Sequence, residues 1–273
     1  MSRIPVSALV GLLFTGAFLF LAIFAPWVAP YGTGDVVGDV WGPMTAKHWL
    51  GTDNLGRDLL SRMIHGTRVT LLIAGLATAL SFLLGSILGF VAAVVGGRLD
   101  QTLSRGVDLL MAVPTLIFAL VVLSVLPSTI PVLILVMGIL DATRVFRLAR
   151  AVAVDINVMD FVEAARLRGE KTRWIVFSEI LPNALTPLVS ELGLRFIFAV
   201  LFLSALSFLG LGVQPPEADW GGMVRENKEG IVFGVPAALI PAAAIAVLTI
   251  SVNLVADWVL NRTADLKGGR GHA

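Results

Sequence analysis

The stretch Asp160-Phe-Val-Glu-Ala-Ala-Arg-Leu-Arg-Gly169 is a short charged segment in a chain that is otherwise strongly apolar. Long apolar runs lie on both sides of it, and Pro182 follows in the sequence after its glycine. Connections between packed elements are usually short, and long ordered ones usually have a function, so an insert of about thirty residues predicts a place where another molecule docks.

The first half of this insert is expected to be a short helix. Asp160 can cap it, and Glu163 completes an Asp-x-x-Glu variant of the capping box. Gly169 suits the left-handed position that ends many helices. The methyl side chains of Ala164 and Ala165 would let the surface of another protein come close to the backbone.

The second half is expected to form another helix over residues 173–181. Thr172 can cap it, and Pro182 is expected to end it, because proline lacks the N–H group that would continue the hydrogen-bond pattern. From the residues alone a second interpretation stays open, in which the insert is a basic amphipathic hairpin lying on lipid headgroups.

Composition places the chain in a membrane. It has 57% hydrophobic and 14% charged residues, with a mean hydropathy of +0.89, whereas soluble domains have about 45–50% apolar and about 25% charged residues. The apolar runs recur too regularly for a separate globular unit, so residues 1–273 are expected to form one transmembrane domain. The absence of cysteine excludes disulfides and thiolate metal sites.

A membrane span needs roughly 20 apolar residues, and six segments reach or approach that length. They are residues 6–25, 69–95, 107–126, 130–145, 185–213 and 235–260. The first is expected to be a retained anchor, because it is longer than the roughly 7–15 apolar residues of a signal peptide. The fourth is the weakest, because Asp141 interrupts it. An all-α fold with six spans places both termini on one side.

The placement of Lys and Arg sets the expected orientation. Most of these residues outside the spans fall on the side of the termini, which the positive-inside rule assigns to the cytoplasm. Residues 151–182 are then cytoplasmic. Residues 26–68 and 214–234 are extracytoplasmic.

Two sets of residues carry a family resemblance. Glu163-Ala164-Ala165, Gly169 and Leu181-Pro182 resemble the "EAA loop" of ABC-importer permeases, in which a separate ATPase grips the membrane subunit. The stretch 51–58 resembles the Gly-Thr-Asp-x-x-Gly-Arg-Asp signature of the dipeptide, oligopeptide and nickel branch. Its matching positions are Gly51, Thr52, Asp53, Gly56, Arg57 and Asp58. Further matches extend the resemblance over about residues 49–261, and it is closest to the second, C-type permease of peptide importers.

The resemblance implies a type I importer subunit in a bacterial cytoplasmic (inner) membrane. The implied partners are a homologous permease, two cytoplasmic ATPase subunits and an extracytoplasmic solute-binding protein, in a lipid membrane and without nucleic acid. ATP and magnesium would belong to the ATPases, so this chain would need no cofactor and have no catalytic site. The residues implied to couple to the ATPases are Asp160, Glu163, Ala164, Ala165, Gly169, Leu181 and Pro182, with the Glu163 charge facing a basic patch. The substrate cannot be identified from the sequence.

The sequence contains neither a P-loop nor a His-Glu-x-x-His metal motif. A P-loop needs a second glycine before its lysine, but Gly169-Glu-Lys-Thr172 has Glu170 there. His48, His65 and His272 are scattered and suggest no metal site. An ion-coupled secondary transporter is the alternative function. Such carriers usually contain internal repeats, and none is found in this chain.

Ionisable residues inside spans are functional candidates by default. Glu191 and Arg195 are four residues apart, so they can pair on one helix face. They would either line a translocation path or hold neighbouring helices together, and the same two interpretations apply to Asp141 with Arg144, to Asp108 and to Asp257. Ser204 and Ser207 belong to a small polar strip that would line a path or serve helix packing.

Several local features give more specific expectations. Gly85-x-x-x-Gly89 offers a smooth face for close helix packing, and Pro114 is expected to bend its span. Near the signature, Asp53 can cap a helix beginning near Leu55, in which Asp58 and Arg62 would pair four residues apart.

The segment 214–234 has two interpretations. With Trp220 and Glu226 it would meet the binding protein, or it would be a solvated turn whose tryptophan lies among the headgroups.

Overall fold

The structure is a computed structural model that describes residues 4–268 and the side chains of residues 4–262. His272 lies outside the described residues. The α-helices are α1 (Val6–Val28), α2 (Leu59–Val95), α3 (Gly97–Ala112), α4 (Thr115–Val125), α5 (Ile130–Asn157), α6 (Asp160–Leu167), α7 (Thr172–Trp174), α8 (Leu181–Phe208), α9 (Trp220–Asn227) and α10 (Leu239–Gly268). Further helical segments are the π-helix η1 (Ile175–Ile180) and the 3-10 helices η2 (Lys228–Phe233) and η3 (Pro236–Ala238).

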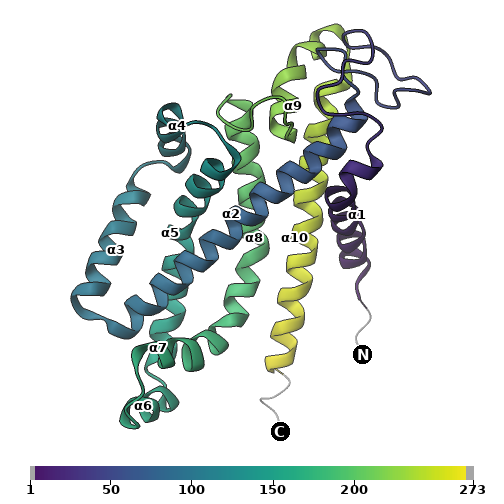
Figure 1. Ribbon diagram of the computed structural model, residues 1–273. Helices are drawn as coiled ribbons and strands as arrows, with labels where there is room; N and C mark the ends of the chain where they lie inside the picture. The colour runs from purple at the N-terminus through teal and green to yellow at the C-terminus, as the bar shows by residue number, and fades with distance from the viewer. Residues whose placement is uncertain (1–3, 269–273) are drawn as a thin grey trace.

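The expected all-α fold is confirmed. The long helix α2 crosses obliquely over α5 and α8, and α10 and α1 follow on the far side of α8 (Figure 1). The α6–α7 region forms one end of the molecule, called here the α6 end. The opposite end, called the α9 end, carries α9 and the loop of residues 29–58 (Figure 1).

The pairing of α2 with α5 depends on two glycines. A Cβ atom added to Gly85 would lie 2.7 Å from the Ala142 carbonyl oxygen, and one added to Gly89 would lie 2.8 Å from the Phe146 carbonyl oxygen. Both distances are shorter than van der Waals contact, so the helices approach this closely only because these side chains are absent. The expected packing role of the Gly85-x-x-x-Gly89 motif is confirmed.

Within the described residues, four helical segments are long and apolar enough to cross a membrane. They are Val6–Val28, Leu59–Val95, Thr172–Phe208 and Pro236–Arg262. The bent pair α3 and α4 is a fifth candidate. α5 is not among them, since Asp141, Arg144 and Arg147 interrupt its apolar stretch. The six-span topology stays a prediction.

The expected third segment, residues 107–126, is not one continuous helix. α3 ends at Ala112, α4 begins at Thr115, and their axes differ by 85°. Pro114 disfavours helical geometry at the residue before it, and Val113 is indeed extended, with φ −91° and ψ 132°. The bend expected at Pro114 is therefore confirmed, in the strong form of a break.

The expectation that Pro182 ends a helix is wrong. The helical segment runs without a gap from Thr172 to Phe208, and Pro182 lies in the first turn of α8. The π-helix η1 immediately precedes it, with the Leu181 N–H bonded to the carbonyl of Val176, five residues back. This wider turn accommodates the ring and the missing N–H of proline, which an ordinary α-helix would not.

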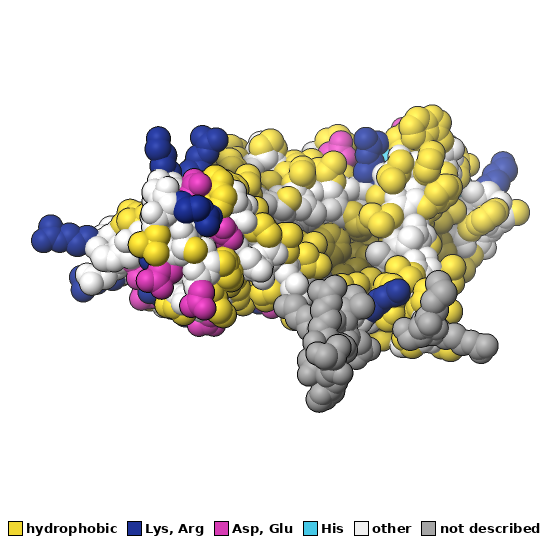
Figure 2. Space-filling model, turned by 90° about the horizontal axis from the view of Figure 1, so that it is seen from below, with side chains coloured by type: hydrophobic (Ala, Val, Ile, Leu, Met, Phe, Trp, Pro, Cys, Tyr) yellow, Lys and Arg dark blue, Asp and Glu magenta, His cyan; other side chains and the backbone are white. Residues whose placement is uncertain are grey.

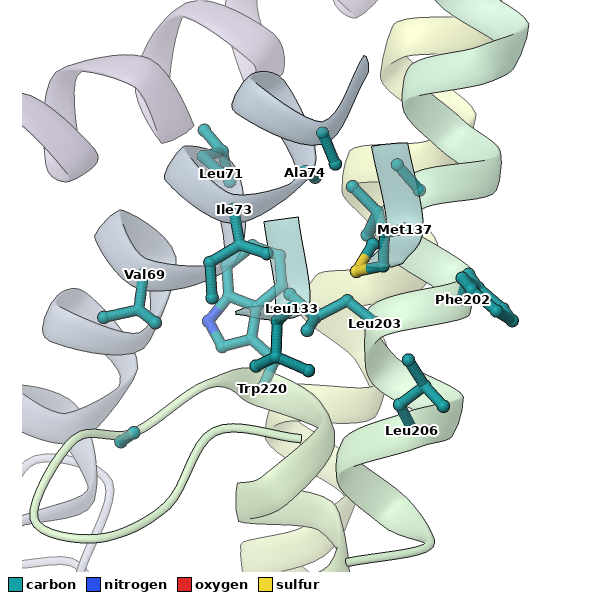
Figure 3. Close-up of a cluster of buried hydrophobic side chains, with 14 of the residues drawn as sticks. Val69, Leu71, Ile73, Ala74, Leu133, Met137, Phe202, Leu203, Leu206 and Trp220 are labelled. Atoms are coloured by element: carbon teal, nitrogen blue, oxygen red, sulfur yellow. The ribbon is translucent and has the colours of Figure 1, made fainter. Parts of the chain in front are cut away.

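A large apolar core joins α2, α4, α5, α8, α9 and α10. At its α9 end the indole of Trp220 is fully buried near Val69, Ile73 and Leu133 (Figure 3). Its Nε1 donates to the Met63 carbonyl at 3.3 Å. The interpretation that Trp220 lies among lipid headgroups is therefore wrong, because its ring packs inside the protein.

Candidate functional site

The α6 end carries a helical hairpin, defined as residues 160–180. Its first helix begins as expected at Asp160, but the residue that caps it is Met159 and no side chain makes a capping hydrogen bond. The expected capping box is therefore wrong. Asp160 and Glu163 lie instead within the first turn, where their negative charges interact favourably with the helix dipole.

The corner of the hairpin is built by Gly169. Its φ of +82° is in the left-handed region, as expected from the sequence. The Gly169 N–H donates to the Arg166 carbonyl at 2.9 Å, and the next N–H, of Glu170, donates to the Ala165 carbonyl at 3.2 Å. These bonds satisfy carbonyls at the end of α6 and fix the direction of the chain into α7.

The two faces of α6 have different partners. Val162 and Ala165 are fully buried, whereas Ala164 and Glu163 are exposed. Leu167, one helical turn after Glu163, is 83% exposed. Ala165 packs inside the protein, so the expected contact of both alanines with a docked surface applies only to Ala164.

Glu163 is free to bind something else. No hydrogen bond or ion pair joins its carboxylate to another described residue. A groove of about 930 Å³ lies at the corner of the hairpin and is lined by Gly169, Glu170, Lys171, Arg173, Trp174, Phe177 and Ser178. The view from the α6 end shows acidic and basic side chains gathered on the side where α3, α6 and α7 lie (Figure 2).

The hairpin is anchored to the rest of the protein by a second apolar core. Val162 of α6 and Ile180 of η1 are fully buried in it, together with Ala153 of α5, Phe90 of α2 and Leu188 of α8. A force applied to α6 would therefore reach three long helices through close-packed side chains.

At the α9 end, the signature stretch forms a buried ion cluster. Asp53 Oδ2 accepts hydrogen bonds from Arg57 Nε at 2.7 Å and Arg62 Nη1 at 2.5 Å. Glu226 of α9 accepts from Arg57 Nη2 at 2.8 Å and Arg62 Nη1 at 2.6 Å. The two carboxylates balance the two guanidinium groups, and Asp53, Arg57 and Arg62 are almost completely buried.

This geometry corrects two expectations. α2 begins at Leu59 and is capped by Asp58, whose Oδ2 accepts from the Ser61 N–H at 2.8 Å; it does not begin near Leu55 with Asp53 as its cap. Asp58 pairs with His48 at 2.9 Å instead of with Arg62. The cause is that Asp53 and Glu226 occupy the Arg62 guanidinium, leaving the Asp58 carboxylate for the helix end.

The glycines of the signature close the loop around this cluster. Gly51 has φ +76° and Gly56 has φ +77°. A Cβ atom at Gly56 would lie 2.2 Å from the carbonyl oxygen of Gly38. Thr52, also buried, donates its hydroxyl to the Asp39 carbonyl at 2.5 Å. The signature residues are therefore structural: they shape the loop and tie it to α9.

Sequence reasoning missed two residues of this site, Glu226 as an ion partner and Asn227. The Asn227 side-chain oxygen accepts from the Asn54 N–H at 3.0 Å and from Trp41 Nε1 at 3.3 Å. The sequence signal that could have indicated such partners is the presence of Arg57 and Arg62 in one short stretch, because arginines that become buried need carboxylate partners. The sequence does not say which carboxylates come near.

The pairing of Glu191 with Arg195 is confirmed. Arg195 Nε donates to Glu191 Oε1 at 2.8 Å, and Arg195 Nη1 lies 3.3 Å from Asp141 Oδ1 of α5. Asp141 also accepts from Ser81 of α2 at 3.2 Å. This cluster joins three helices, which favours the interpretation that it holds neighbouring helices together.

The polar strip of α8 is partly covered in this structure, with Ser207 buried and Ser204 half-buried. Ser207 is 2% exposed, and a Cβ atom at Gly221 of α9 would lie 2.5 Å from the Ser204 carbonyl oxygen. This packing against the 210–221 segment favours the interpretation that Ser204 and Ser207 serve helix packing. Asp108 pairs with Arg147 at 2.7 Å, and Asp257 accepts from Asn253 at 3.3 Å.

Asp219 is a second buried acid that the sequence did not indicate. Its Oδ2 accepts from the Gly221 N–H at 3.0 Å at the start of α9. Burial raises the pKa of the Asp219 carboxyl to about 6. The folded state therefore binds this proton more tightly than the unfolded chain, so the contribution of Asp219 to stability declines as pH rises from about 4 to 6.

We expect Asp219→Asn to stabilise the protein at pH 7, because Asn keeps an oxygen for the Gly221 N–H and carries no charge. A pKa shift of this size corresponds to about 3 kcal/mol at most. Melting temperatures in detergent should show an advantage of the variant that is larger at pH 7 than at pH 4.5. An advantage that does not change with pH would contradict the role of the buried charge.

Side chains that together hold a metal ion were not found among the described residues. The long apolar helices define a polytopic membrane protein with a helical hairpin exposed at one end. The chain belongs to the family described as binding-protein-dependent transport system inner membrane component, whose model matches residues 81–265. It is a permease subunit of an importer in the inner membrane, a transport component and not an enzyme.

Similar proteins cover almost the whole chain. The di/tripeptide transport system permease protein of Pseudomonas aeruginosa is 36% identical over 92% of this chain and 85% of its own. The dipeptide transport system permease protein of Alkalihalophilus pseudofirmus is 31% identical over 92% and 83%. The glutathione transport system permease protein of Pectobacterium atrosepticum is 30% identical over 90% and 82%. Resemblance to the peptide-importer permeases is thereby confirmed.

Proposed function

We propose that this chain is one of two homologous permease subunits of an ATP-driven importer for peptides or related small solutes. The names of its relatives, which include di/tripeptide and glutathione permeases, support this substrate class. Two ATPase subunits would bind at the α6 end and a solute-binding protein at the α9 end. The excess of Lys and Arg near the α6 end supports a cytoplasmic location for that end and for both termini.

One observation carries the mechanism: α6 is exposed on one face and fixed on the other. Phe161 and Leu167 offer apolar contacts to an ATPase, and the carboxylate of Glu163 offers a charge. Val162 and Ala165 bind the opposite face to the second core. Closure of the ATPases would move α6, and the close packing would pass that motion to α2, α5 and α8 as a rigid-body rotation.

The α9 end would provide a rigid surface on which the solute-binding protein docks. The signature loop, α9 and the start of α2 are held together by the buried ion cluster. Trp220 and Glu226 are occupied inside this structure, so a binding protein would meet the exposed residues around them. Exposed side chains there include Glu217, Glu229 and Lys228.

The test is the charge reversal Glu163→Lys in the complex of this chain with its permease and ATPase partners. We expect ATP-driven uptake in proteoliposomes to fall at least tenfold while the chain still reaches the membrane, because Lys would face a basic surface of the ATPase. The matched control is Asp155→Lys, an exposed acidic residue on the neighbouring helix α5, which should transport normally.

Unchanged uptake by the Glu163→Lys complex would reject α6 as the coupling element. Solute uptake by the purified chain alone would reject the importer and favour an ion-coupled carrier. Co-purification of a second permease and two ATPases with the wild-type chain is the expected result.

A further inference from the structure

Three arginines of α5 form a row at intervals of three residues, and two of them are paired with carboxylates of α3. Arg150 Nη2 donates to Asp100 Oδ2 at 2.6 Å, and Arg147 Nη2 donates to Asp108 Oδ1 at 2.7 Å. Arg144 is the third member of the row. It is the one of the three that lies farthest from the C-terminal end of α5, next to the break between α3 and α4.

Arg144 has no carboxylate at hydrogen-bond distance. The nearest is Asp141 Oδ1, at 4.0 Å from Arg144 Nη1, and that carboxylate is already bound by Arg195 and Ser81. The only hydrogen bond of the Arg144 side chain to a described residue is a long one, 3.5 Å, to the hydroxyl of Thr115. Its guanidinium stacks on Phe198, 4.3 Å from the ring centroid, which leaves the edge with its N–H groups available.

These N–H groups border a cavity of about 300 Å³. The break at Pro114 turns α4 away from α3 and opens this space against α5. Thr115 and Thr143 line it together with Arg144, and Met111 and Leu140 supply apolar walls. A guanidinium with the Thr115 hydroxyl beside it, in a small space, is suited to bind one anionic group.

In the expected six-span topology Arg144 lies at the end of the fourth span, residues 130–145, where a charge is costly unless it is paired or lines a polar path. Arg147 and Arg150 follow that span and are paired through α3. Arg144 would be paired if a carboxylate from outside this chain occupied the open position.

We propose that Arg144 and Thr115 bind the carboxylate of the solute during its passage, so that the break between α3 and α4 is a recognition point on the translocation path. This inference rests on the proposed importer function. A planar guanidinium binds a carboxylate through two parallel hydrogen bonds, an arrangement that a lysine cannot reproduce. A solute without a free carboxylate would gain nothing from the site.

The experiment compares Arg144→Gln, Arg144→Lys and Arg147→Gln in the assembled complex. The probes are a dipeptide that the wild-type complex transports and its C-terminal amide, each at a concentration that saturates the binding protein. We expect Arg144→Gln to lower uptake of the free acid at least tenfold and to leave uptake of the amide unchanged. Arg144→Lys should be intermediate, and Arg147→Gln, on the same helix face but already paired, should stay within about twofold of wild type.

Three outcomes would overturn the proposal. Equal losses for the acid and the amide would make Arg144 structural. Normal uptake of the acid by Arg144→Gln would show that the site is not used. Failure of the Arg144→Gln complex to assemble would assign the open position to a carboxylate of a partner subunit. A wild-type complex without ATP-dependent uptake would instead reject the importer function itself.

Discussion

Replacement of Asp53 by alanine is expected to destabilise the protein by about 3–5 kcal/mol, the usual cost of leaving a buried charge without its partner. The Asp53 carboxylate is 0% exposed and neutralises Arg57 and Arg62 together with Glu226. Without it, two buried guanidinium groups share one carboxylate. Thermal unfolding in detergent, followed by size-exclusion chromatography, should show a large fall in melting temperature and in folded yield.

The matched control is Asp39→Ala. Asp39 lies in the same loop but is exposed, and its contact with Thr52 uses the backbone carbonyl, which alanine keeps. Its melting temperature should equal that of the wild type. Glu226→Gln removes the charge from the partly exposed carboxylate of the cluster. Its melting temperature should lie between those of Asp53→Ala and Asp39→Ala. A melting temperature of Asp53→Ala equal to that of the control would show that the ion cluster does not stabilise the α9 end.

The second large effect is expected from Gly89→Leu at the crossing of α2 and α5. A Cβ atom there would already lie 2.8 Å from the Phe146 carbonyl oxygen and 2.9 Å from the Arg150 N atom. Both are backbone atoms of a helix and cannot move aside as a side chain can. Overpacking usually costs about 1–3 kcal/mol, and a leucine at this position should reach the top of that range or separate the helices.

Gly75→Leu is the control for this change. Gly75 lies on the same helix, but no atom lies within 4 Å of an added Cβ, and leucine is a better helix former than glycine. We expect Gly75→Leu to fold and assemble like the wild type and Gly89→Leu to lose the folded, assembled form. Equal behaviour of the two variants would contradict the close approach of α2 and α5.

Several features of the fold and of the site could be predicted because they depend on neighbours in the sequence. The left-handed corner at Gly169, the break at Pro114 and the pairing of Glu191 with Arg195 all belong to this group. In each case the decisive atoms lie within a few residues, so backbone geometry and helical spacing are sufficient. The Gly85 and Gly89 packing face was visible for the same reason, although its partner helix was not.

Predictions failed where a local rule competed with a distant contact. Asp58 and Arg62 have helical spacing, but Arg62 binds Asp53 and Glu226, and the latter is 164 residues away along the chain. Trp220 has the composition of an interfacial tryptophan, yet the core formed by α2, α5 and α8 encloses it. Pro182 would end an isolated helix, but η1 carries the chain past it.

The sequence by itself determined that this chain is an all-helical membrane protein with a helical hairpin between two apolar segments, because hydropathy and short motifs are properties of contiguous residues. Only the tertiary structure decided which face of α6 is free and which carboxylates neutralise the signature arginines. It also decided that Arg144 is the one member of the α5 row of three arginines without a carboxylate from the described residues at hydrogen-bond distance. The physical reason is that burial and charge pairing depend on which distant segments meet, and the order of residues along the chain does not fix those distances.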